Sequence, residues 1–162
     1  MSIETKLNPK LDLVFERTTT VPAEKLWKGW TDPQMLMKWF CPRPWKVSDA
    51  RINLQAGGEF YTLMQSPEGA TFPNTGCYLE VIENKKLVWT NLMTEGFRPA
   101  QLAPHDFGIT ATLTLTQTAQ GTLYRAVVCH ASEDGVQKHK QMNFEEGWGM
   151  AFNQLIELIE GK

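Results

Sequence analysis

The sequence lacks any long hydrophobic run. No segment approaches the roughly 18 consecutive apolar residues of a membrane-spanning helix, and the first residues, MSIETKLNPKLDL, show no cationic region followed by an apolar one. These absences exclude a membrane span and a secretory signal peptide. We therefore expect a cytoplasmic protein.

The sequence also lacks a large excess of charge of either sign. The 162 residues include 16 Lys and Arg against 18 Asp and Glu, for a net charge of −2, and like charges do not run together. Proteins that follow a phosphate backbone carry clustered basic residues. Nucleic acid is therefore not an expected partner.

Cysteine and histidine are scarce, with three of each. Cys41, Cys77 and Cys129 form no CxxC pair, which predicts reduced and mostly buried thiols. The histidines show neither HxxxH nor HExxH spacing, so we expect no metal and no cofactor. Cys129 and His130 are adjacent, but neighbours on a strand point to opposite faces and do not form a nucleophile and base pair. No catalytic residue is predicted.

The most regular pattern lies near the end of the sequence. Over residues 143–160, at about 100° per residue, the apolar side chains share one arc and the charged ones cover the other side. This predicts a one-sided helix of about five turns. Gly147 and Gly149 inside it each cost roughly 1 kcal/mol relative to Ala, which suggests that a strand or ligand passes close by, although close packing explains them equally well.

The remaining residues indicate short elements. Residues 11–16 alternate as in a strand, and two short helices follow, one beginning at Pro22 and one with Asp32 as N-cap and Pro33 at its first position. From residue 45 the period changes to two, and strands are expected over 47–54, 59–65, 75–83, 87–93, 107–116 and 123–131. Residues 94–106 are the longest irregular piece and are placed to border an opening. Gly57 and Gly58 lead into a strand, which favours a tight turn or bulge over a phosphate site.

This order of elements predicts one domain over residues 1–162, with its core over about 11–160. The fold class is α+β, of the helix-grip type: a seven-stranded curved antiparallel sheet wraps around the long C-terminal helix, and two short helices lie between the first and second strands. One helical stripe does not fill a curved sheet, so a cavity is expected between them.

Many short segments, in order, carry a family resemblance. They are VPAE (21–24), LW (26–27), WTDP (30–33), WF (39–40), GG (57–58), EVI (80–82), LVWT (87–90), GT (121–122) and EGW (146–148). Over about residues 11–160 the sequence resembles the activator of Hsp90 ATPase homologues, within the START-like (SRPBCC) helix-grip superfamily. The resemblance implies a deep apolar cavity, in a superfamily that binds lipids, polyketides, hormones and other hydrophobic small molecules.

Two departures from the family pattern stand out. Before the double glycine the family usually has Asp-x-Arg, and here these positions are Asn53 and Gln55, so any ion pair between the usual residues is absent. The eukaryotic co-chaperone that named the family carries an additional N-terminal chaperone-binding domain, for which this sequence has no room. That weakens the expectation of a chaperone partner.

Strand parity and helix phase predict which side chains line the cavity. The predicted lining consists of Trp39, Phe60, Thr62, Met64, Trp89, Met93, Phe107, Trp148 and Phe152. A single bulge would reverse the parity of a strand, and any one of these residues is also explained as ordinary core. Glu80 and Arg125 are candidate polar anchors inside, although solvated strand residues are the more common outcome.

Three functions remain open. The first is a non-catalytic carrier or sensor of a small hydrophobic molecule, and the second is a polyketide cyclase or aromatase, which needs inward-facing titratable groups that the sequence does not supply convincingly. The third is a partner that stimulates an Hsp90-type chaperone. The apolar strip over residues 35–45 is either the surface of a homodimer or the mouth of the cavity.

Overall fold

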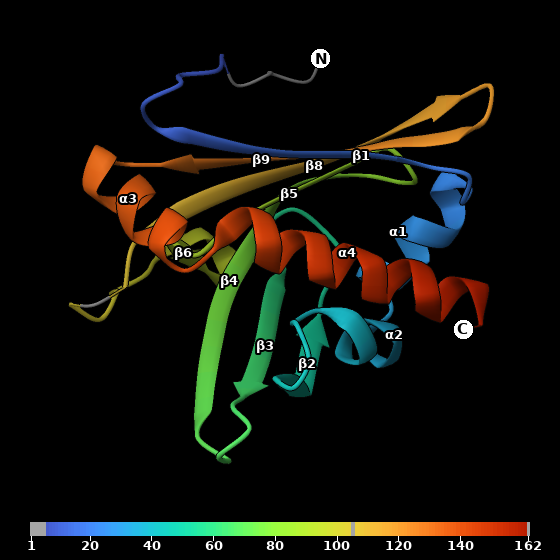
Figure 1. Cartoon of the computed structure of the whole chain (residues 1–162). Helices are drawn as coiled ribbons and strands as arrows, with labels where there is room; N and C mark the ends of the chain where they lie inside the picture. The colour runs from blue at the N-terminus through green and yellow to red at the C-terminus, as the bar shows by residue number, and fades with distance from the viewer. Residues whose placement is uncertain (1–5, 105, 162) are drawn as a thin grey trace.

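The computed structural model describes residues 6–104 and 106–161. Within them a seven-stranded antiparallel sheet has the order β1-β9-β8-β5-β4-β3-β2, and four α-helices accompany it (Figure 1). Its strands are β1 (Asp12–Thr19), β2 (Lys46–Ile52), β3 (Glu59–Gln65), β4 (Thr71–Ile82), β5 (Lys86–Thr90), β8 (Ile109–Thr118) and β9 (Gly121–His130). The helices are α1 (Ala23–Thr31), α2 (Pro33–Trp39), α3 (Glu133–Gln141) and α4 (Phe144–Glu160). The predicted α+β helix-grip fold is confirmed.

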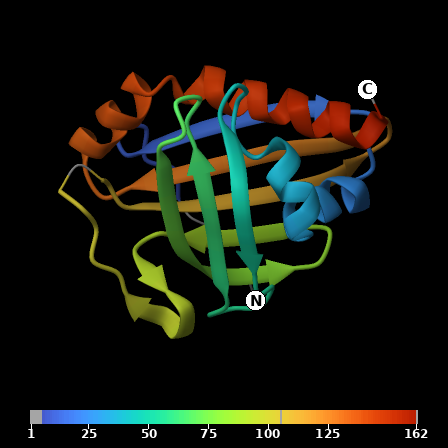
Figure 2. The same ribbon diagram turned by 90° about the horizontal axis from the view of Figure 1, so that it is seen from below.

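The long helix α4 crosses one face of the sheet and packs against β1, α1, α2 and α3. Strands β2, β3 and β4 run across the direction of β1, β8 and β9, so the sheet bends sharply (Figures 1 and 2). The helices α1 and α2 lie beside β2 at the end of this bend (Figure 2). The helix α4 therefore covers the part of the sheet near β1, and α1 and α2 cover much of the rest.

The two faces of the sheet differ in character. Along β8 the side chains of Ala111, Leu113 and Leu115 are buried, and the threonines between them point the other way. Leu113 pairs with Ala126 of β9, which belongs to the same core cluster as the buried residues of α4. We call the face toward α4 the inner face, and the opposite one the outer face.

Helix α2 begins as the sequence predicts, because the Asp32 side chain accepts a hydrogen bond of 2.9 Å from the Gln34 backbone amide and Pro33 occupies the first turn. The end of α2 is tied to α4 by the buried Gln154. Its amide nitrogen donates to the carbonyl groups of Trp39 (3.0 Å) and Cys41 (2.8 Å). Its side-chain oxygen also accepts a hydrogen bond from a backbone amide of the α2–β2 connection. One side chain thus joins two segments far apart in the sequence.

Two elements differ from the sequence prediction. Helix α3 was not predicted from the sequence, because it buries only Gly135 and Val136 and so lacks a hydrophobic period. Its one local signal is Ser132, an N-cap that accepts a hydrogen bond of 3.1 Å from the Gly135 amide. Strand β5 ends at Thr90, so Met93 does not continue it but begins the small hairpin of β6 (Met93–Thr94), a 3-10 turn η1 (Glu95–Phe97) and β7 (Arg98–Pro99).

Some glycines occupy positions where a side chain would clash, and others occupy positions where one would fit. A Cβ at Gly58 would lie 1.9 Å from the Asn53 carbonyl oxygen, and Gly57 has a φ of 84°, so the predicted tight turn is confirmed. A Cβ at Gly147 would meet only Pro42, at 4.0 Å, and one at Gly149 would meet nothing closer than 3.7 Å. No described strand therefore approaches Gly147, whereas at Gly149 the side chains of Arg17 and Phe15 on β1 lie at ordinary van der Waals distance.

The cysteines match the prediction of reduced thiols. Cys41 and Cys77 are free and buried, and Cys129 is partly buried. Burial raises the pKa of the Cys41 thiol to about 11, which keeps it protonated near neutral pH.

In the part of the chain that the structure describes, the helices are too short or too polar to cross a lipid bilayer.

Candidate functional site

Six aromatic side chains meet on the inner face where α1 and α2 approach β3, β4 and β5. We call this group the aromatic wall, and its members are Trp30, Trp39, Phe40, Phe60, Tyr78 and Trp89. Trp30 lies centrally, with ring centroids 4.9 Å from Trp39, 5.5 Å from Phe40 and 5.1 Å from Trp89. Edge-to-face and tilted pairs at these separations stabilise by about 0.5–1.5 kcal/mol each beyond burial. The wall is a continuous apolar surface drawn from five elements.

The strand side of the wall is built by register. Tyr78 pairs with Trp89 across β4 and β5, and Phe60 stacks on Tyr78 with centroids 5.1 Å apart and an interplanar angle of 14°. Phe60 also meets Trp89 edge to face at 5.6 Å. Gly76, opposite Phe60, has no side chain, and a Cβ there would lie 2.6 Å from the Thr90 carbonyl oxygen. The three rings are therefore held by backbone pairing rather than by loops.

A second aromatic group lies beside the wall under α4. Phe15 of β1 contacts Tyr124, Trp148 and Phe152, with ring centroids 6.0–6.2 Å apart. The two groups are joined by a buried hydrogen bond of 3.0 Å, which Trp30 Nε1 donates to the Tyr124 hydroxyl. The interior is thus continuous from α2 to α4.

The predicted lining residues are only partly brought together. Trp39, Phe60 and Trp89 belong to the aromatic wall, and Thr62 is buried on the same face of β3 as Phe60. Met64 lies at the far end of β3, where it is partly buried.

The remaining predicted lining residues lie elsewhere. Trp148 and Phe152 lie in the second aromatic group. Phe107 and Met93 lie apart from both groups, because Phe107 packs against His139 and Met93 belongs to the small hairpin.

Sequence reasoning did not name Tyr78 and offered Glu80 as an anchor inside, and a bulge in β4 explains why Glu80 lies outside. The pairing of β4 with β5 shifts between Tyr78 and Glu80, so these two residues, although two apart, point to opposite faces. Tyr78 is fully buried inside, whereas Glu80 lies outside in an ion pair of 2.7 Å with Lys86. Arg125 is also outside, 3.2 Å from Glu16. The idea that Glu80 and Arg125 are polar anchors inside is therefore wrong.

The two buried tyrosines do not titrate near neutral pH. Burial raises the pKa of the Tyr78 and Tyr124 hydroxyls well above their usual range. Both tyrosines are therefore neutral at neutral pH. Among the described residues of the aromatic wall, none is an acid or base poised for proton transfer.

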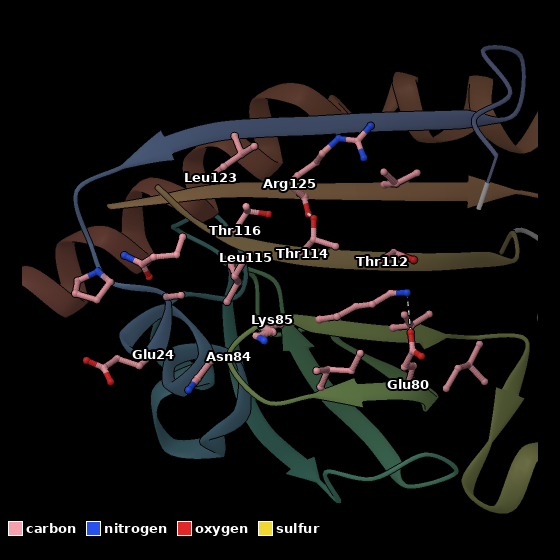
Figure 3. Close-up of a pocket in the computed structure, with 18 of the residues that line it drawn as sticks. Glu24, Glu80, Asn84, Lys85, Thr112, Thr114, Leu115, Thr116, Leu123 and Arg125 are labelled. Carbon is pink, nitrogen blue, oxygen red and sulfur yellow. Dashed lines mark hydrogen bonds and ion pairs between the residues drawn. The ribbon is translucent and has the colours of Figure 1, made fainter. Parts of the chain in front are cut away.

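An open groove with a volume of about 1230 Å³ lies on the outer face (Figure 3). Its floor carries the threonines of β8 and the outward residues of β9, and its edges are the start of α1 and the β4–β5 turn. Figure 3 shows Arg125 and Thr114 on one side and Glu80 on the other, with α4 behind the sheet. This groove is separate from the predicted lining, because it lies across the sheet from the aromatic wall.

Two histidines meet where α3 packs against β9. His130 Nδ1 lies 2.9 Å from the Leu11 carbonyl oxygen, which only accepts, so Nδ1 carries a proton. In the neutral ring Nε2 is then an acceptor, and it receives a hydrogen bond of 2.9 Å from His139 Nδ1. Phe107 and Phe144 pack against the His139 ring. Both ring nitrogens of His130 therefore have hydrogen-bond partners.

This pair predicts an acid-dependent loss of stability. Burial, with a smaller contribution from His130, lowers the pKa of His139 from 6.5 to about 4, so the unfolded chain takes up this proton at a higher pH than the folded protein. Stability is complete above pH 6.5 and falls as the pH drops toward 4, by about 2 kcal/mol after a discount for partial exposure. Urea unfolding between pH 7.5 and 4 measures this loss of stability. The variant His139→Gln keeps a hydrogen-bond donor for His130 but does not titrate, so its free energy of unfolding is expected to depend less on pH. Parallel profiles for the two proteins would contradict this origin.

The described side chains offer no group of three or more His, Cys, Asp or Glu residues placed to hold a metal ion.

The sequence profile of the family described as activator of Hsp90 ATPase homolog 1-like protein matches residues 20–160. The chain belongs to this family. The matched range runs from the approach to α1 to the end of α4, and so includes the whole aromatic wall.

Several solved structures share this fold. The chain is similar to a crystal structure of a protein from Nitrosomonas europaea, at 44% identity over 96% of this chain and 97% of that one, with a TM-score of 0.90. The fold alone is shared with a protein from Rhodobacter sphaeroides (21% identity, 97% and 98% of the chains, TM-score 0.82). It is also shared with the AHSA1-like protein from Aeromonas hydrophila (18% identity, 93% of each chain, TM-score 0.70). A comparison with curated proteins finds no match.

In this member of the activator of Hsp90 ATPase homolog 1-like family, the segment before the double glycine is held by neutral groups. Gln55 Nε2 donates a hydrogen bond of 3.1 Å to Asn53 Oδ1. The Gln55 carbonyl accepts from the Gly58 amide at 2.8 Å, which closes the turn. Asn53 and Gln55 are therefore joined by a hydrogen bond, and not by an ion pair.

Proposed function

We propose that this protein binds a small hydrophobic molecule between the aromatic wall and α4, as a non-catalytic carrier or sensor. The observation that carries the proposal is the aromatic wall itself. Its six rings come from α1, α2, β3, β4 and β5, and they gather in the part of the interior that α1 and α2 cover. Apolar surface buried against such a wall contributes roughly 25 cal/mol per Å².

The chemistry of the interior supports binding without catalysis. Its two buried tyrosines, Tyr78 and Tyr124, stay neutral because burial raises their pKa values. The His130 and His139 pair packs between α3, β9 and Phe107 and not on the wall. A cyclase requires an acid or base at the reacting atoms, so this arrangement favours a carrier or sensor over a cyclase.

An exposed aromatic pair supports an entrance near the turn that closes the β3–β4 hairpin. Trp45, on the connection after α2, is 38% exposed, and Phe72, at the start of β4, is 47% exposed. Their rings lie 5.5 Å apart, and Phe72 pairs with Met64 on β3. Exposed neighbouring aromatics next to a buried apolar wall are typical of a binding site. Residues 35–45, the predicted apolar strip, lead from the wall to this pair.

The outer groove is a less favourable site for such a ligand. Glu80 and Lys86 form an ion pair on its floor, and Arg125 is paired with Glu16 beside it. These groups are already partnered by each other, and the threonines of β8 give the floor a polar surface. A hydrophobic molecule gains more from the buried aromatic wall than from this solvated surface.

The test is native mass spectrometry of protein purified from its source cells without organic solvent. We expect a discrete adduct that disappears from the denatured sample, is lost or much reduced in Trp89→Leu and Phe40→Leu, and persists in Arg125→Ala on the outer face. Phe40 is partly exposed, so its variant provides a milder change if Trp89→Leu does not fold. A bare wild-type chain would exclude a tightly retained ligand, and an adduct lost only in Arg125→Ala would move the site to the groove.

A further inference from the structure

One buried hydroxyl stands apart from the other polar groups of the interior. Tyr78 has no exposed surface, and its hydroxyl has no hydrogen-bond partner within the described residues. Tyr124 is buried to nearly the same extent, but its hydroxyl accepts a hydrogen bond from Trp30 Nε1. Buried polar atoms in folded proteins almost always have a partner, and a buried one without a partner calls for an explanation.

The rest of the interior shows that this chain otherwise satisfies its buried polar side chains. The Gln154 amide makes three hydrogen bonds, and the Thr122 hydroxyl donates to the Val21 carbonyl at 2.7 Å. His130 uses both ring nitrogens. A phenylalanine at position 78 would keep the stacking with Phe60 and would leave no orphaned hydroxyl. The hydroxyl therefore has no structural purpose among its protein neighbours.

The hydroxyl belongs to the aromatic wall. The Tyr78 ring stacks on Phe60, and β4 holds it directly opposite Trp89. We infer that Tyr78 is the hydrogen-bonding anchor for the ligand, a neutral and mainly apolar molecule that carries one hydroxyl or carbonyl group. This inference rests on the proposed function and specifies the chemical class of its ligand as an alcohol, phenol or ketone.

The neutrality of the ligand follows from the surroundings of the anchor. No described member of the aromatic wall carries a charge, so a carboxylate or an amine would be buried against apolar rings without a counter-charge. Burial raises the pKa of the Tyr78 hydroxyl, so it keeps its proton and both donates to a carbonyl and accepts from a hydroxyl. A molecule without a hydroxyl or carbonyl group would leave the Tyr78 hydroxyl without a partner. The wall therefore discriminates against such a molecule.

The experiment compares two probes of similar size, 1-naphthol and 1-methylnaphthalene, by isothermal titration calorimetry. We expect Tyr78→Phe to weaken binding of 1-naphthol by about tenfold and to leave binding of 1-methylnaphthalene within about twofold of wild type. The ligand-free Tyr78→Phe protein is expected to melt at the same temperature as wild type or higher, because the lost hydroxyl had no partner. Tyr124→Phe, which removes a partnered hydroxyl, is expected to lower the melting temperature.

Each outcome bears on one of the two proposals. If wild type binds both probes and Tyr78→Phe changes both affinities equally, or changes neither, the anchor is overturned and the hydrophobic site stands. If neither probe binds wild type, the proposed function and the anchor both fail. A melting temperature that falls in Tyr78→Phe as much as in Tyr124→Phe would assign the hydroxyl a structural partner and would overturn the inference.

Discussion

Trp30→Ala is expected to lower the free energy of unfolding by about 3–5 kcal/mol, which is a large part of the 5–15 kcal/mol typical of a domain this size. Trp30 is 1% exposed and lies at the centre of the aromatic wall, in contact with Trp39, Phe40 and Trp89. Its removal also leaves the buried Tyr124 hydroxyl without the hydrogen bond that it now receives. Urea unfolding followed by circular dichroism measures the loss.

Two further variants separate packing from hydrogen bonding. Trp30→Phe keeps an aromatic ring but removes the donor to Tyr124, and is expected to cost about 1–2 kcal/mol. Trp45→Ala removes an indole that is 38% exposed, and is expected to cost less than about 1 kcal/mol. If Trp30→Ala and Trp45→Ala had similar effects, the aromatic wall would not be the energetic centre of the core.

Gly58→Ala is expected to destabilise the protein by about 2–3 kcal/mol, as an overpacked interior does. The added Cβ would lie 1.9 Å from the Asn53 carbonyl oxygen and 3.0 Å from that of Gln55, and both neighbours are backbone atoms that do not move aside cheaply. The turn that they form fixes the start of β3, where the Tyr78 amide donates a hydrogen bond of 3.0 Å to the Gly58 carbonyl and the Gly57 amide donates one of 2.7 Å to the Tyr78 carbonyl. The measurement is again the midpoint of urea unfolding.

Gly147→Ala is the matched control, because it adds the same methyl group at a position with space. Its Cβ would meet only Pro42, at 4.0 Å, and the residue lies within α4. We expect it to stabilise the protein by about 0.5–1 kcal/mol, as Ala does relative to Gly in a helix. A loss of stability at Gly147 as large as that at Gly58 would show that the space around α4 is smaller than the geometry indicates.

Elements with a strong hydrophobic period were predictable from sequence. The prediction for 59–65 coincides with β3, and the helix predicted over 143–160 is α4. Asp32 and Pro33 correctly predicted where α2 begins. Helix α3 was not predictable in this way, because a helix that buries two small residues has no apolar stripe.

The candidate site was harder to predict because it depends on how elements meet. Parity and helix phase placed Trp39, Phe60 and Trp89 inside, where they are buried, whereas the bulge before Glu80 reverses the parity of β4 and puts Glu80 on the outer face. Phe107 packs against His139 of α3, and that helix was not foreseen. Such features depend on contacts between distant segments, and local patterns carry little information about them.

The hydrogen bonds of Gln154 have a consequence for synthesis of the chain. They join α4 to the end of α2 across 115 residues of sequence, and Trp30 reaches Tyr124 across 94. Contacts so distant in sequence form late, because the intervening chain must first be ordered. Until the ribosome has released α4, the wall tryptophans and Phe15 have no cover on one side. The nascent chain therefore exposes its most hydrophobic surface until its translation is nearly complete.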